Sequence, residues 1–97
     1  MPKGYWIVNN DITDPETYQK YKDFDSGVAR DFGGKFLARA GRQECPEGTA
    51  HARTVVVEFE SYDIAVECYY AAGYSAARAI REPAAEGNFI IVEGYGD

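Results

Sequence analysis

The sequence predicts an α+β fold whose elements follow the order strand, helix, strand, strand, helix, strand. Two observations carry this prediction. Four short stretches are alternating or continuously apolar, as strands are, and two longer stretches repeat apolar residues at steps of three and four, as helices do. Glycine, proline and polar residues separate them. At 97 residues the chain is expected to form one domain, residues 1–97, with a modest core.

The first strand is expected over Gly4–Ile12. The helix after it should begin at Thr13, because Thr13 and Glu16 have the spacing of a capping box. Gly33 and Gly34 should end it, because glycine accepts the left-handed backbone of a helix C-terminus. The apolar residues of this helix form one stripe: Tyr18, Tyr21, Phe24, Val28 and Phe32.

The second and third strands are expected over Lys35–Arg42 and Arg53–Glu60, joined by a polar loop over Gln43–Ala52. The third strand is apolar on both faces. Alternation places Val57 on one face and Glu58 on the other, so one carboxylate is set among hydrophobic residues. This pattern indicates a sheet that is covered on both sides, with a charged group in or near the second covering.

The second helix should begin after Ser61, a natural N-cap, and Gly73 should kink or break it. Pro83 marks its end, and a last strand is expected over Asn88–Tyr95. The residues expected to face inward from this helix are Ile64, Ala65, Cys68, Tyr69, Ala72, Ala77 and Ile80.

This order is that of the split βαβ, ferredoxin-like arrangement, in which one antiparallel sheet has both helices on one face. Each helix has one apolar stripe, enough to cover one face of the sheet and no more. The uncovered face is expected to carry Tyr5, Ile7, Leu37, Val56 and Ile91. Monomers rarely expose such a patch, and a second copy packed sheet against sheet would cover it. We therefore predict a homodimer through this face.

The composition argues against several classes of partner. A net charge of −6 argues against nucleic acids and anionic membranes, which need basic patches. No apolar run approaches the roughly 20 residues of a membrane span, and the first four residues do not begin a secretory signal. Two cysteines, Cys45 and Cys68, are too few for a disulfide scaffold. We expect a small acidic protein of the cytoplasm, with no nucleic-acid or membrane partner.

Arg39 and Glu58 are the main candidates for catalytic residues. Alternation places both on the uncovered face of neighbouring antiparallel strands. Three interpretations stay open: a buried ion pair that fixes the register or the dimer geometry, an arginine that holds an anion beside a general base, or two side chains that reach solvent.

Four further residues are candidates for ligand binding. Tyr69 and Tyr74 would line a cleft between helix and sheet, or pack with their hydroxyls at the surface. Asn9 is either a ligand-facing amide or the end of the buried part of its strand, and Arg81 either contacts a ligand or lies on a solvated helix face. His51 is the only histidine, so neither a metal site nor a cofactor, haem included, is expected.

The chain resembles the family catalogued as domain of unknown function 1330, nearly end to end. The residues that carry the resemblance are Gly4-Tyr5-Trp6-Ile7, Asp14-Pro15-x-x-Tyr18, Gly33-Gly34-x-Phe36-Leu37-x-Arg39-x-Gly41, Glu47-Gly48, Arg53-x-Val55-Val56-x-Glu58-Phe59-x-Ser61, Tyr69, Tyr74, Arg81 and Val92-Glu93-Gly94. The resemblance implies a dimeric α+β barrel and no settled activity. Glu60, Cys68 and Gly73 depart from the family pattern, which puts a shared pocket around the second helix in doubt.

Three functions stay open, and the sequence does not decide whether the protein is an enzyme. One is a cofactor-independent enzyme acting on a small aromatic or carbonyl-bearing metabolite in a cleft between sheet and helices. Arg39 would then hold an anion, Glu58 would act as base, and Tyr69 or Tyr74 would wall the site. The others are a non-catalytic module that binds a small molecule and a purely structural dimer. Cofactor-independent monooxygenases share the implied fold, which is an analogy of fold alone.

Overall fold

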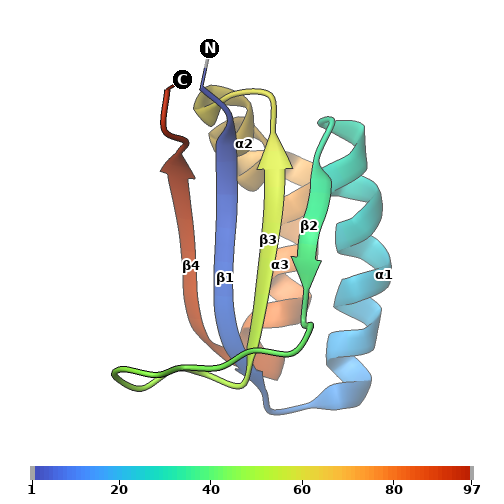
Figure 1. Cartoon of the computed structure of the whole chain (residues 1–97). Helices are drawn as coiled ribbons and strands as arrows, with labels where there is room; N and C mark the ends of the chain where they lie inside the picture. The colour runs from blue at the N-terminus through green and yellow to red at the C-terminus, as the bar shows by residue number, and fades with distance from the viewer. Residues whose placement is uncertain (1, 97) are drawn as a thin grey trace.

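The computed structural model describes residues 2–96, apart from the side chains of residues 23–26 and 72. One sheet of four antiparallel strands forms the front layer in Figure 1, in the order β2-β3-β1-β4, and the helices cover its rear face. The ferredoxin-like prediction is therefore confirmed. The elements are β1 (Gly4–Ile12), α1 (Pro15–Asp31), β2 (Lys35–Arg39), β3 (Arg53–Phe59), α2 (Tyr62–Tyr70), α3 (Ala72–Arg81), the short 3-10 helix η1 (Glu82–Ala84) and β4 (Ala85–Glu93).

Helix α1 is capped by Asp14, one residue later than the predicted Thr13. The Asp14 carboxylate accepts hydrogen bonds from the backbone N–H of Thr17, at 3.3 Å, and from its hydroxyl, at 2.7 Å. The N–H of Thr13 instead donates to the carbonyl of Ala84, which ties the start of the helix to η1. The predicted end is confirmed, because Gly33 has a φ of +78° and its N–H donates to the carbonyl of Arg30.

The second helix is broken in two, as predicted, but at Ala71 rather than at Gly73. Ala71 has extended dihedral angles, with φ −65° and ψ 148°, and separates α2 from α3. Cys68 and Tyr74 are six residues apart, so in one continuous helix they would point about 120° apart. The break allows both side chains to be fully buried against the sheet.

A β-bulge changes the faces of β2. Phe36 pairs with Val57, but Ala38 pairs with Val56 and Arg39 with Val55, so Leu37 is the extra residue of the bulge. An extra residue in one strand moves every later side chain of that strand to the other face. Arg39 therefore lies on the helix-covered face of the sheet, not on the uncovered face as predicted. The strand ends there, short of the predicted Arg42.

The last strand begins and ends earlier than predicted. In its pairing with β1, Ile91 lies opposite Trp6, which places Ile91 on the helix-covered face and corrects the predicted assignment. Ile90 and Val92 lie on the uncovered face instead and are 52% and 43% exposed. The uncovered face is thus apolar, as predicted, but with these two residues in place of Ile91.

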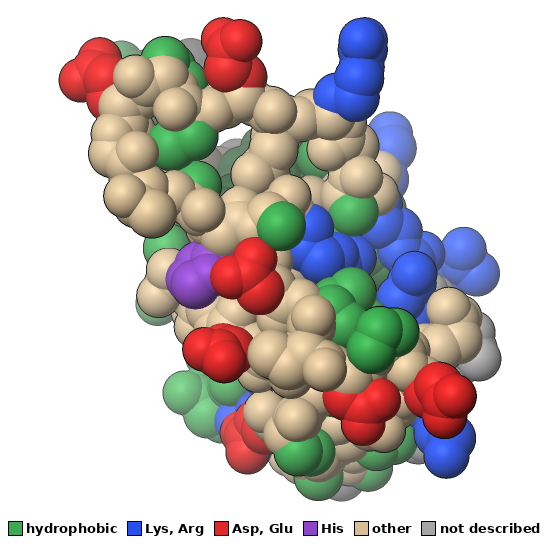
Figure 2. Space-filling model, turned by 90° about the horizontal axis from the view of Figure 1, so that it is seen from below, with side chains coloured by type: hydrophobic (Ala, Val, Ile, Leu, Met, Phe, Trp, Pro, Cys, Tyr) green, Lys and Arg blue, Asp and Glu red, His purple; other side chains and the backbone are tan. Residues whose placement is uncertain are grey.

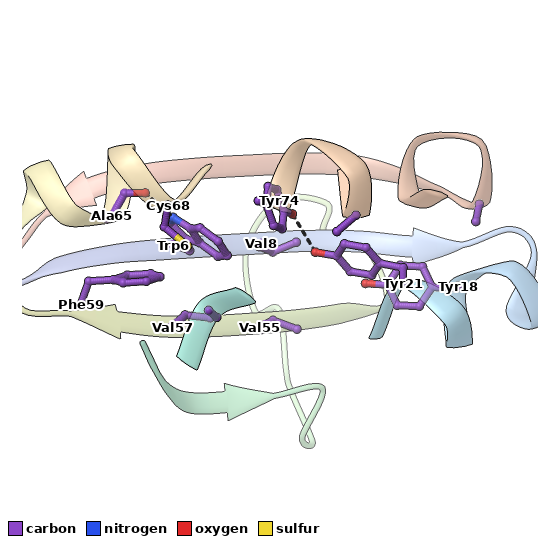
Figure 3. Close-up of a cluster of buried hydrophobic side chains, with 13 residues drawn as sticks. Trp6, Val8, Tyr18, Tyr21, Val55, Val57, Phe59, Ala65, Cys68 and Tyr74 are labelled. Carbon is purple, nitrogen blue, oxygen red and sulfur yellow. Dashed lines mark hydrogen bonds between the residues drawn. The ribbon is translucent and has the colours of Figure 1, made fainter. Parts of the chain in front are cut away.

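The core is a cluster of aromatic rings between the sheet and the helices (Figure 3). Trp6 lies at its centre, with ring centroids 4.9 Å from Phe59 and 5.0 Å from Tyr74. Its indole N–H donates to the carbonyl of Ala65, 2.9 Å away, so burial leaves this polar group satisfied. Within the stripes predicted from sequence, Phe24 and Ala72 lie outside the described side chains, and all the other residues are buried or half-buried, as predicted.

Candidate functional site

A crevice runs between the sheet and α1, on the face that the helices cover. Its aromatic lining comes from four elements: Trp6 of β1, Tyr18 and Tyr21 of α1, Phe36 of β2 and Phe89 of β4. The space between the lining atoms is about 340 Å³, but this volume includes open solvent at the mouth of the crevice. The cavity volume itself is only about 20 Å³, which is room for about one water molecule and far below the roughly 300 Å³ of small-ligand sites. A larger ligand therefore requires side chains at the mouth to move.

Three cationic side chains line the same crevice: Lys22, Arg39 and Arg53. Among the described residues that line it, none is an aspartate or a glutamate. Figure 2 looks at the end of the sheet where β3 begins, and basic side chains gather there beside hydrophobic ones. A protein with a net charge of −6 thus places positive charge at one concave site. Fixed positive charge in such a cleft attracts anions.

Arg53 is the best-defined of these cations. Its Nη1 donates to the hydroxyl oxygen of Tyr18, 2.5 Å away, and to Oδ1 of Asn10, 3.2 Å away. The guanidinium carbon lies 4.9 Å from the centre of the Tyr18 ring, a cation–π distance. Both hydrogen-bond partners are neutral, so the guanidinium is oriented but its charge is not neutralised by them.

The hydroxyl oxygen of Tyr18 accepts two hydrogen bonds from protein groups. Besides the bond from Arg53, it accepts a long hydrogen bond of 3.4 Å from Nδ2 of Asn10, which is 2% exposed. A phenol has one hydrogen to donate and two lone pairs to accept with. With both lone pairs engaged, Tyr18 can offer a further partner only its hydrogen. The group is therefore arranged to donate to an oxygen in the crevice.

Two other arginines flank the aromatic lining. Arg39 lies with its guanidinium carbon 4.4 Å from the centre of the Phe36 ring. Arg81, near the end of α3, lies 5.4 Å from the centre of the Phe89 ring and 5.9 Å from that of Tyr21. The Nε of Arg81 is buried and has no hydrogen-bond partner in the described part of the chain. A buried donor without a partner costs free energy, so this atom is a place where a ligand oxygen would be stabilised.

The predicted pair of Arg39 and Glu58 is not brought together. Glu58 pairs with Tyr5 across β1 and β3, on the uncovered face, and the Tyr5 hydroxyl donates to its carboxylate at 3.3 Å. Because of the bulge at Leu37, Arg39 lies on the opposite face, in the crevice. Within one chain, Glu58 cannot act on a ligand that Arg39 holds.

The four residues predicted to bind a ligand lie in different places relative to the crevice. Tyr74 is fully buried and Tyr69 half-buried in the aromatic core, and neither lines the crevice. Asn9 lies on the uncovered face, where its side chain bonds the backbone of His51 and Arg53 and so holds the end of the loop. Arg81 is the one member of this set that flanks the crevice, through its contacts with two lining rings.

His51 has a local partner that the sequence did not suggest. Its Nδ1 lies 2.8 Å from the carboxylate of Asp11, and the N–H of Ala52 donates to the same carboxylate at 2.7 Å. These two hydrogen bonds hold the pKa of Asp11 below its usual value, that from His51 being the larger cause. Over the described residues, no three His, Cys, Asp or Glu side chains gather as a metal site would require.

Sequence reasoning missed Arg53, Tyr18 and Asn10 as a functional group. The alternation of the strands already indicates that Asn10 and Arg53 lie on the same face of the sheet as the core residues of their strands. A polar residue on the apolar face of a strand must be hydrogen-bonded, and an arginine opposite an asparagine is an obvious partner. The contact with Tyr18 depends on how α1 packs, which the strand pattern does not contain.

Comparison with protein families gives a match over most of the chain. The family model described as "Domain of unknown function (DUF1330)" matches residues 3–95. The chain belongs to the DUF1330 family. A comparison with curated proteins found no match.

Several solved structures share the DUF1330 chain's fold. A protein of unknown function from Rhodopseudomonas palustris is 16% identical, with a TM-score of 0.78, and the match covers 99% of this chain and 85% of that one. A dimeric ferredoxin-like protein of unknown function from Thermobifida fusca is 15% identical, with a TM-score of 0.61 and coverage of 95% and 89%. A candidate antibiotic biosynthesis monooxygenase from Caulobacter crescentus is 17% identical, with a TM-score of 0.53 and coverage of 95% and 88%. At these identities the likeness establishes the fold alone.

In the stretch from residue 2 to residue 96, no helix has the length and apolar character needed to span a bilayer.

Proposed function

We propose that the protein binds a small aromatic or carbonyl-bearing metabolite in the crevice between sheet and α1 and acts on it without a cofactor. The observation that carries the proposal is the pairing of Arg53 with the Tyr18 hydroxyl inside an aromatic crevice. Preorganised donors and positive charge stabilise negative charge that develops on an oxygen, the largest single term in many enzyme mechanisms. The crevice thus suits a reaction in which a carbonyl oxygen becomes more negative, such as enolisation, with water accepting the α-hydrogen as a proton.

The roles of the crevice residues follow from their geometry. Tyr18 would donate its hydrogen to the substrate oxygen, with Arg53 and Asn10 fixing its orientation. Trp6 and Phe36 would pack against the apolar part of the substrate, and Arg39 would lie at the mouth. Glu58 has no part in this site, because it lies on the other face of the sheet.

A second candidate function is binding without catalysis. The observation that favours it is the absence of aspartate and glutamate among the described lining residues, since a carboxylate is a common general base for carbon acids. The same crevice would then hold a metabolite as a sensor or carrier does. Both candidates require a ligand in the crevice, and they differ in whether that ligand is turned over.

The single tryptophan gives a direct test. Trp6 lines the crevice as well as the core and is the only indole, so its NMR signal and fluorescence come from one known position. We expect aromatic ketones or acids in a metabolite panel to shift the Trp6 indole signal and Tyr18→Phe to weaken that binding. If no compound moves the signal up to millimolar concentration, the crevice is not a ligand site. Exchange of ligand α-hydrogens with deuterated water, lost in Tyr18→Phe, separates the enzyme from the carrier.

We also propose that the protein is a homodimer, joined through the uncovered face of the sheet. Ile7, Val56, Ile90 and Val92 make that face apolar, and the related fold from Thermobifida fusca is described as dimeric. Sedimentation should give a dimer for the parent and a monomer for Ile90→Lys. Tyr70→Lys, which changes a residue 69% exposed on α2, is the matched control and should remain dimeric. A monomeric parent would contradict the proposal.

The cytoplasm is the proposed location, and a single domain the proposed organisation. Both described cysteines are free thiols, as expected where thiols are kept reduced.

A further inference from the structure

The charges of two arginines point to the chemical class of the ligand. Arg53 and Arg81 flank the crevice lining on different elements, β3 and α3. Neither has a carboxylate within ion-pair distance anywhere in the described chain. Arg78, one turn before Arg81 on α3, has its Nε 3.8 Å from Glu82. The two crevice arginines therefore differ from their neighbour in lacking a negative partner.

The hydrogen-bond donors of Arg53 show where a partner would bind. All of its bonds to protein come from Nη1, which leaves Nη2 and Nε without a protein acceptor in the described residues. A guanidinium presents its donors in a planar fork that matches the two oxygens of a carboxylate. The Tyr18 hydroxyl, with its lone pairs engaged, adds a hydrogen beside the fork. Every free group at this point is a donor.

Arg81 on α3 repeats the pattern beside two other rings of the aromatic lining. Its Nε is buried and unpartnered, while its guanidinium lies over the Tyr21 and Phe89 rings. A guanidinium that is partly withdrawn from water, without a counter-charge, is unfavourable unless an anion completes it. A ligand with a flat, apolar ring would pack against these aromatic side chains, and negatively charged oxygens on it would accept hydrogen bonds from the arginines. An aromatic acid has both features.

Building on the proposed function, we propose that the ligand is an organic anion: a planar aromatic or conjugated carboxylate. Its carboxylate binds Arg53 and Tyr18, its ring lies against the aromatic lining, and a second oxygen substituent reaches Arg81. The closed crevice has space for about one water molecule, so binding moves the side chains at the mouth.

The test compares matched acid and amide probes on the full chain. Benzoate, 4-hydroxybenzoate and their amides are titrated while the Trp6 indole signal and the thermal midpoint are followed. We expect both acids to bind at least tenfold more tightly than their amides, and the affinity to fall as salt rises. 4-Hydroxybenzoate, whose second oxygen lies at the far end of the ring from its carboxylate, should bind more tightly than benzoate.

The variants separate charge from packing. Arg53→Met and Arg81→Met should each weaken 4-hydroxybenzoate binding about tenfold or more, the loss expected for a charge-assisted hydrogen bond. Arg53→Lys keeps the charge without the fork and should retain part of the affinity. Arg78→Met, on the same helix as Arg81, should bind like the parent. Tyr18→Phe provides a second test at the Arg53 end if Arg53→Met does not fold.

The outcomes distinguish this inference from the function on which it rests. If amides bind as tightly as acids and Arg53→Met binds both like the parent, the ligand is not an anion, although the crevice remains a ligand site. If no acid, amide or neutral ketone moves the Trp6 signal, both the inference and the proposed function are wrong. Tight acid binding that Arg53→Met and Arg81→Met leave unchanged places the anion elsewhere and overturns the inference.

Discussion

The hydroxyl groups of Tyr21 and Tyr74 lie 2.7 Å apart, within hydrogen-bonding distance, in the buried layer between α1 and α3 (Figure 3). Both side chains are almost fully buried, at 6% and 0% exposure. The bond crosses from one helix to another, and its two residues also pack against the rings that line the crevice. It therefore links the position of α1 over the crevice to the core.

Removing either hydroxyl should destabilise the fold modestly. Tyr21→Phe and Tyr74→Phe are each expected to lower the free energy of unfolding by about 1 kcal/mol, the net value of a typical hydrogen bond. In the double variant the two losses should not add, because both remove the same bond. Denaturation in urea measures all three. Tyr95→Phe, at a residue 98% exposed, is the control and should leave stability unchanged. Strict additivity would show that the two hydroxyls do not interact.

A pair of glycine substitutions should have opposite effects. Gly87 has a φ of +152°, and a Cβ added there would overlap the carbonyl oxygen of Asn9. Gly87→Ala is expected to cost about 3 kcal/mol or more, because backbone strain and overpacking combine. A Cβ at Gly27, within α1, meets nothing within 4 Å. Gly27→Ala should instead stabilise the protein by about 0.5–1 kcal/mol, because alanine favours helix.

The midpoint of thermal unfolding checks this prediction, because the same change from glycine to alanine is made at both sites. The midpoint should fall in Gly87→Ala and rise in Gly27→Ala. Equal midpoints for Gly87→Ala and the parent would mean that β4 does not approach β1 as closely at Asn9 as described.

The local signals in the sequence predicted most of the fold. Ser61 caps its helix and Gly33 ends α1, because these features depend only on residues a few positions away. The bulge at Leu37 could not be predicted in this way, because it exists only in the pairing of β2 with β3. That one extra residue moved Arg39 to the other face of the sheet and separated it from Glu58.

The candidate site was only partly predictable for a related reason. Arg39 and Arg81 were singled out from sequence, and both lie beside the aromatic lining. The contact of Arg53 with Tyr18 joins residues 35 positions apart on a strand and a helix. Alternation fixes the face of Arg53, but only the packing of α1 on the sheet decides which α1 side chain it meets.

The contact between Asp11 and His51 should make the end of the loop over residues 40–52 sensitive to acid. The pKa of Asp11 is lowered in the folded protein, chiefly by its hydrogen bond with His51. A group with a lowered folded pKa stabilises the fold above its unfolded pKa, near 3.8 for this carboxyl. That stabilisation is lost as the pH falls through the lower, folded pKa.

The amide signals of His51 and Ala52 provide the measurement. In an NMR titration, the Ala52 N–H bonded to the Asp11 carboxylate should report a midpoint below 3.8. Asp11→Asn should abolish this transition and speed hydrogen exchange at Ala52 near neutral pH. Asp63→Asn, at an exposed carboxylate on α2, is the control and should leave both readings unchanged. A midpoint above 3.8 would contradict the described contact.

The two cysteines should differ sharply in reactivity. Cys45 is exposed in the loop before β3, and its thiol donates to the carbonyl of Glu47 at 3.1 Å. Cys68 is fully buried in α2 beneath the aromatic core, so a reagent can reach it only when the helix opens. Ellman's reagent should therefore modify one thiol per chain in the native protein and two in denaturant. Cys45→Ser should leave no fast-reacting thiol, and Cys68→Ser should leave the fast reaction intact. If Cys68 reacts as fast as Cys45 in the native protein, α2 does not stay packed against the sheet as the fold requires.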